Sequence, residues 1–202
     1  MQLWGIGGTK GEIIMKRKGF TLVELLIVIV VIGVLSTMMM LSSTEAVSSA
    51  KAATIISNLR NLKTATLAWY ADNLDRVVKD SNGYQINTNG TKQKIDNFAR
   101  DHADEILKYL NAENSIKLKN PESNKGTVGA YVLHDVDQKK GIWLAGYKLF
   151  NDTKDADTRL VEKLAARASA VGLKNQNNVE YTWTKNGDTD KYVYINILNL
   201  SE

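Results

Sequence analysis

The sequence predicts an α+β protein in which a long N-terminal helix packs against a small antiparallel sheet of about four strands. Three observations lead to this prediction. No residue is charged from Leu25 to Leu41, and apolar residues then recur every three or four positions from Ile55 to Trp69. Two pairs of segments rich in β-branched and aromatic residues follow, each pair separated by a polar turn. The helix therefore has an apolar half followed by an amphipathic half.

The apolar half, residues 20–41, has the length of a membrane-spanning helix. At about 1.5 Å per residue it can cross a hydrocarbon layer of about 30 Å. Lys16, Arg17 and Lys18 directly precede it, and basic residues beside a membrane segment tend to stay in the cytoplasm. We therefore expect one membrane pass, with most of the chain on the far side.

Glu24 lies inside this apolar segment. Charged side chains such as Asp cost about 2.5–3.5 kcal/mol at the centre of a membrane helix, so an acidic residue there suggests a function. A secretory signal peptide, the alternative explanation for the segment, gains nothing from a carboxylate. If the chain is cut between Gly19 and Phe20, the new α-amine lies one helical turn from Glu24, in the same chain or a neighbouring one. Such an ion pair would fix the register between helices.

Residues 18–24, Lys-Gly-Phe-Thr-Leu-Val-Glu, resemble the class III leader and N-terminal helix of type IV pilins and of the pilin-like subunits of type II secretion and DNA-uptake machines. The resemblance covers about 30 residues, including Gly33, and implies a pilin-like fold. It implies that residues 1–19 are a leader, that a prepilin peptidase cleaves after Gly19, and that the new terminal Phe20 is N-methylated. The basic leader residues are Lys16, Arg17 and Lys18. Translation starting at Met1 or at Met15 gives the same mature product.

The resemblance also implies partners and a location. The expected partners are further copies of this chain, other pilin-like subunits, the prepilin peptidase, an inner-membrane assembly platform and, before assembly, membrane lipid. The chain would be anchored in the bacterial cytoplasmic (inner) membrane with its head outside the cytoplasm, and would then enter a cell-surface or periplasmic filament. It would be a structural subunit without catalytic residues or a cofactor. A pilus, a secretion pseudopilus and a DNA-uptake machine remain alternatives, as do major and minor subunits.

Charge gives no support to nucleic acid as a partner. The whole chain has a formal net charge of +4, but residues 1–19 contain four basic residues and one acidic residue. Their removal leaves 22 basic and 21 acidic side chains. A near-neutral protein is not a general polyanion binder, although a local basic patch is compatible with this total.

The helix is expected to continue through residues 42–75 as an amphipathic segment that carries the globular head, residues 76–202. Ile55, Leu59, Leu62, Thr66 and Trp69 form its apolar stripe. We interpret Trp69 as a core residue because it lies on this stripe, and not as part of a binding platform. The chain has no cysteine, so the head is expected to hold together by packing and hydrogen bonds alone.

The head pattern predicts several elements in order. Residues 75–97 are polar and predict a connecting loop with Asn-Gly turns. The remaining elements are a helix over 102–110 capped by Asp101, a hairpin of 128–136 with 142–150, a helix over 156–171 that stops at Gly172, and a second hairpin of 179–184 with 192–198.

Other candidate sites are weak. Asn186, Asp188 and Asp190 alternate like the first half of a calcium loop, but Lys191 stands where an EF-hand needs glycine. His102 and His134 have no spacing typical of a metal site, and no catalytic motif surrounds the serine pairs at 42 and 48. An adhesive or DNA-binding tip subunit remains an alternative function. It predicts an exposed basic and aromatic patch, with these candidate residues: Lys139, Lys140, Trp143 and Trp183.

Overall fold

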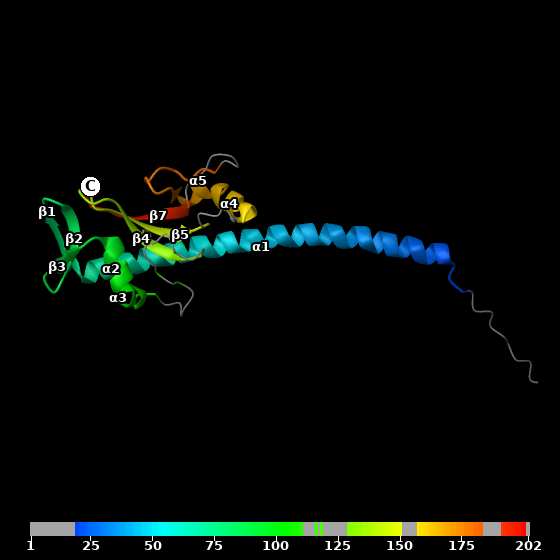
Figure 1. Ribbon diagram of the computed structural model, residues 1–202, viewed down its shortest axis with the longest axis horizontal. Helices are drawn as coiled ribbons and strands as arrows, with labels where there is room; N and C mark the ends of the chain where they lie inside the picture. Colours follow the sequence, from blue (N-terminus) through cyan, green and yellow to red (C-terminus); the bar gives the residue numbers. More distant parts are fainter. Residues whose placement is uncertain are drawn as a thin grey trace, which may run out of the picture. The chain divides into compact units, whose positions relative to one another are not determined.

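The computed structural model describes residues 19–110, 116, 118, 129–150, 157–183 and 191–200. The chain divides into two compact units, Met1–Ser43 and Thr44–Glu202, and the division falls within the first helix, α1 (Leu22–Asp72). The second unit combines helices with antiparallel sheets, which confirms the predicted α+β class (Figure 1).

In the first unit, α1 is apolar on all sides. Every large apolar side chain from Leu22 to Leu35 is at least 48% exposed. Two hydroxyl groups are satisfied within the helix: Ser36 Oγ donates to Ile32 O at 2.7 Å, and Thr37 Oγ1 donates to Gly33 O at 2.9 Å. Among the described residues, α1 is the one helix long and apolar enough to cross a membrane. A surface of this kind needs an apolar environment, either lipid or other helices.

In the second unit, the C-terminal half of α1 carries the predicted stripe. All five predicted positions are buried, with Trp69 only 1% exposed. Helix α1 ends at Asp72 and a short 3₁₀ turn, η1 (Leu74–Arg76), follows. Figure 1 shows strands of the main sheet alongside this part of α1. The prediction that Trp69 is a core residue is confirmed.

The main sheet has four antiparallel strands in the order β4-β5-β7-β6. Their bounds are β4 (Tyr131–Asp137), β5 (Ile142–Lys148), β6 (Leu173–Lys174) and β7 (Tyr192–Asn199). The first predicted hairpin is confirmed as β4 with β5. The second predicted hairpin is wrong: residues 179–183 form no strand, and β7 pairs with β5 and β6. Instead Tyr181 N donates to Leu173 O at 2.9 Å, so this segment runs beside β6.

Alternate side chains of the sheet enter the core with α1. Leu133 on β4, Trp143 on β5 and Val193 on β7 belong to one buried cluster with the α1 stripe. Helix α4 (Thr158–Ala165) contributes to the same cluster and is capped by Asp157, whose Oδ1 accepts from Leu160 N at 3.3 Å. The predicted single helix over 156–171 is interrupted, because α5 (Ala168–Val171) starts separately and ends at Gly172. Gly172 has φ +78°, a left-handed conformation that favours glycine, so the predicted stop is confirmed.

The predicted loop over 75–97 is wrong. It contains a three-stranded antiparallel sheet of β1 (Val77–Asp80), β2 (Gly83–Thr88) and β3 (Thr91–Gln93). Asn89 and Gly90, both at positive φ, connect Thr88 to its partner Thr91, which is the geometry of a two-residue hairpin loop. This sheet was not predicted because its strands are polar, although the Asn89-Gly90 turn signal was present in the sequence.

Two short helices follow, α2 (Ile95–Asp101) and α3 (Ala103–Leu107). The predicted helix over 102–110 is present as the shorter α3, but the predicted cap is wrong, because His102 and not Asp101 precedes α3. Asp101 is the last residue of α2, and its carboxylate pairs with Arg100 at 2.6 Å. The apolar residues between 95 and 107 are divided between two helices, and the break between these helices lies at His102.

Candidate functional site at the start of the first helix

Gly19 and Phe20 precede α1 without regular secondary structure. Phe20 is 86% exposed, and no atom lies within 4 Å of the position that a Cβ on Gly19 would occupy. The peptide bond between them is therefore not covered by described parts of the chain. The basic residues Lys16, Arg17 and Lys18 lie outside the described residues.

Thr21 and Glu24 form a capping box at the first turn of α1. The Thr21 backbone N–H and its hydroxyl each donate to Glu24 Oε2 at 2.8 Å, and Glu24 N–H donates to Thr21 Oγ1 at 3.2 Å. This reciprocal pattern satisfies N–H groups that a helix start leaves without partners. The predicted site residue Glu24 therefore has a partner within its own chain.

Sequence reasoning missed Thr21. Its signal was the spacing Thr-x-x-Glu directly before an apolar run, which is typical of a capping box. Only one Glu24 oxygen, Oε2, takes part in the box, and Oε1 has no hydrogen bond to a described residue. The geometry thus leaves Oε1 able to accept from a second donor, such as an α-amine at Phe20 in this chain or another.

The weaker candidates do not assemble into a site in the described part of the head. No group of three or more His, Cys, Asp or Glu residues suited to a metal is found there. His102 stacks on Phe98 with ring centroids 4.8 Å apart, and its Nδ1 lies 3.3 Å from Glu105 Oε1. The calcium candidates Asn186, Asp188 and Asp190 lie outside the described residues.

The residues predicted to form a basic and aromatic patch differ in how far they are buried. Trp143 is 1% exposed and belongs to the core, and Trp183 is partly buried against it. Lys139 and Lys140 are exposed in the turn between β4 and β5. Trp143 is therefore unable to contribute to an exposed patch.

Asp135 on β4 is a shielded carboxyl group. Both of its oxygens are buried without a hydrogen-bond partner among the described residues. Burial raises the pKa of Asp135 to about 7; the nearby Asp96 and Asp137 carboxylates add to this rise, and Lys94 opposes it. The folded head therefore keeps a proton on Asp135 that the unfolded chain releases at about pH 4.

The free energy of unfolding of the wild type is expected to fall as the pH rises, and we expect Asp135→Asn to abolish this fall. Between about pH 4 and pH 7 the folded wild type binds one proton more than the unfolded chain, so its free energy of unfolding falls as the pH rises through this window. At pH 8 the variant should melt about 3–6 °C above the wild type, equivalent to about 1–2 kcal/mol. At pH 4 the two should melt together. Thermal melts of the full chain in detergent, followed by circular dichroism, measure this.

The control variant is Asp75→Asn, which alters an exposed carboxylate. It should leave the melting temperature close to that of the wild type at both pH values. If Asp135→Asn gives no gain at pH 8, or the same gain at both pH values, the shielded carboxyl is not the source of the pH dependence.

Comparison with known families identifies one matching segment. Residues 14–40 match the model described as the prokaryotic N-terminal methylation motif. Comparison with curated proteins and with solved structures gives no match. The matched segment contains Gly19, Phe20, Thr21 and Glu24, so the capping box lies within the motif.

Proposed function

We propose that this chain, which carries the class III prepilin-type signal of type IV pilins and pseudopilins, is a structural subunit of a type IV pilus or pilus-like filament. In this proposal residues 1–19 are the leader, residues 20–41 the membrane and filament-core helix, residues 42–75 its amphipathic continuation and residues 76–202 the head. The motif points to a structural subunit and not to an enzyme. The observation that carries the proposal is the match over residues 14–40.

The apolar first part of α1 supports the proposal physically. Its apolar side chains surround the helix and are all exposed, so it requires lipid before assembly and a bundle of other helices afterwards. One long apolar N-terminal helix is consistent with a subunit anchored in the inner membrane. Repeated head-to-tail contacts between such helices produce a fibre and not a closed ring when the rotation between copies does not close.

Processing is the most direct test. We expect the mature protein to begin at N-methylated Phe20, as read by intact mass and N-terminal sequencing of membrane fractions and of filaments sheared from the native host. This terminus in the sheared fraction supports a pilus subunit; the same terminus confined to membranes supports a pseudopilin or a minor subunit. A terminus at Met1, at Met15 or near Ala46 would contradict the proposal.

We expect Gly19→Val to block processing and leave the leader attached. The space around Gly19 is open within the described chain, so the larger side chain should disturb recognition by the peptidase and not the fold. Intact mass should show the unprocessed chain in membranes and none in sheared filaments. A matched control is Gly33→Ala, also in open space, which should be processed normally. Processing of Gly19→Val to a Phe20 terminus would show that Gly19 is not the cleavage determinant.

A further inference from the structure

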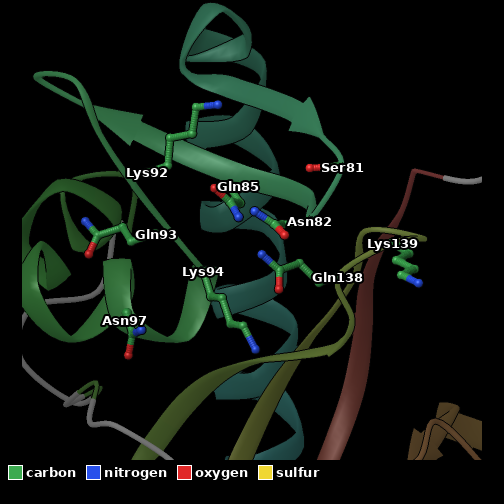
Figure 2. Close-up of a pocket in the computed structure, with 9 residues that line it drawn as sticks. All are labelled: Ser81, Asn82, Gln85, Lys92, Gln93, Lys94, Asn97, Gln138 and Lys139. Carbon is green, nitrogen blue, oxygen red and sulfur yellow. The ribbon is translucent and has the colours of Figure 1, made fainter.

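The head contains a polar pocket. It has a volume of about 640 Å³, within the range of about 300–1,000 Å³ found for ligand sites. Its lining consists of five carboxamide side chains, three lysines and one serine, with no acidic and no aromatic residue. It lies between the three-stranded sheet, α2 and the turn that joins β4 to β5 (Figure 2).

Gly83 allows the two sides of the pocket to approach closely. It has φ +103°, and a Cβ there would collide with the Gln138 carbonyl. Tyr84 N–H donates to that carbonyl at 2.7 Å, which fixes the β4–β5 turn against the start of β2. Gln138 is thereby held beside Asn82 and Gln85, and Lys139 follows it in the lining of the pocket (Figure 2).

The carboxamides supply donors and acceptors that the protein does not use. In Figure 2 the side chains of Asn82, Gln85 and Gln138 gather in the middle of the pocket. None of the three makes a side-chain hydrogen bond to a described residue, although Gln85 and Gln138 are half-buried. A carboxamide offers both an acceptor oxygen and two N–H donors, which suits ligands rich in hydroxyl groups.

The lysines give the pocket a positive charge. Lys92 forms an ion pair with Asp80 at 2.9 Å, whereas Lys94 and Lys139 have no ion pair within the described residues. Carboxylates occur nearby but outside the lining: Asp135 lies close enough to Lys94 to interact electrostatically, and Asp137 accepts from the Lys139 backbone N–H. Two ammonium groups thus remain for an anionic ligand.

We propose that this pocket binds an anionic polysaccharide, whose carboxylate or sulfate groups meet Lys94 and Lys139 and whose hydroxyl groups meet the carboxamides. Single-stranded nucleic acid is the competing polyanion. It is recognised mainly by stacking of bases on aromatic side chains, and the lining has none. The proposal concerns the head alone and holds whether or not the chain assembles into a filament.

Binding is tested with the full chain in detergent by isothermal titration calorimetry. The probes are polygalacturonate oligomers, dextran sulfate, uncharged dextran and a single-stranded DNA oligonucleotide of similar length. We expect binding of polygalacturonate, dextran sulfate or both, and none of dextran. Binding of only one charged polysaccharide identifies its anionic group as the one recognised. Absence of binding to both, or equal binding of uncharged dextran, would overturn the proposal.

Matched variants locate the site. Lys139→Gln combined with Lys94→Gln should weaken binding of the charged polysaccharide by at least about tenfold, a change of about 1.4 kcal/mol. Lys140→Gln combined with Lys108→Gln is the control, because it removes the same charge from two exposed lysines that do not line the pocket. Equal losses in the two double variants would show general charge attraction and overturn the proposed site.

A carboxamide variant separates the saccharide from nucleic acid. Gln85→Ala should weaken polysaccharide binding by at least about threefold, because its hydrogen bonds to the saccharide are lost, and should leave any DNA binding unchanged. Melting temperatures confirm that each variant is folded. DNA that binds more tightly than both polysaccharides, with polysaccharide binding unaffected by Gln85→Ala, would make the pocket a nucleic-acid site and overturn the proposal.

Discussion

Replacing Glu24 with alanine is expected to stop filament assembly while leaving cleavage and methylation intact. The variant loses the carboxylate that we propose pairs with a neighbouring α-amine, and it also loses the acceptor of the capping box with Thr21. Loss of one member of a desolvated charge pair costs about 2–5 kcal/mol at an interface. The yield of sheared filament should therefore fall at least about tenfold, in a host where this subunit is required. Intact mass of the membrane fraction checks processing.

Two further variants separate the two roles of Glu24. Glu24→Gln keeps an oxygen for the capping box, because glutamine also serves at this position, but removes the charge. Thr21→Ala removes the Thr21 hydroxyl from the box and keeps the charge. If the charge sets the register, Glu24→Gln fails to assemble and Thr21→Ala assembles; the reverse pattern would show that the helix cap is what assembly needs. Normal filament yield from Glu24→Ala would remove the proposed role altogether.

Replacing Trp69 with alanine should destabilise the head more than any surface change. Trp69 is 1% exposed, its ring lies 4.8 Å from the Phe98 ring, and Arg76 sits over its face at 5.6 Å. Its Nε1–H also donates to Glu105 Oε2 at 3.4 Å. A buried tryptophan truncated to alanine costs about 3–5 kcal/mol, so the melting temperature should fall by about 10 °C or more. Far-ultraviolet circular dichroism of the full chain in detergent measures this.

Trp69→Phe and Leu74→Ala complete the series. Phenylalanine keeps the ring packing and loses the donor, so the melting temperature of Trp69→Phe should lie between those of the wild type and Trp69→Ala. Leu74 is 56% exposed at the end of the helical segment, and its truncation should change the melting temperature little. Equal effects of Trp69→Ala and Leu74→Ala would show that the core is organised differently.

The sequence predicted the long helix α1 well because its signals are local. A long uncharged run and a regular 3–4 spacing have few alternative explanations, and the buried stripe from Ile55 to Trp69 agrees with the prediction residue by residue. A local signal of the same kind, the spacing Thr-x-x-Glu, also indicates the cap at Thr21. It was missed because Glu24 was considered as a charge and not as a hydrogen-bond acceptor.

The sheets were predicted less completely because pairing is not local. Strand β7 pairs with β5 across more than forty residues, and alternation identifies a strand without naming its partner. Strand β6 is two residues long, too short for any periodic signal. The polar pocket combines residues from three segments, around Gln85, Lys94 and Lys139, so no single stretch of sequence indicated it.

The position of β7 inside the main sheet has a consequence for the order of folding. β4, β5 and β6 are all synthesised before β7. Among the described strands β6 pairs with β7 alone, and one edge of β5 stays open until β7 is added. A nascent chain that has emerged only as far as residue 183 therefore holds an exposed strand edge, which invites pairing with other chains. The head is expected to remain incomplete until the ribosome has released β7. The interval between the synthesis of β5 and the release of β7 is therefore the time when the head most needs a chaperone.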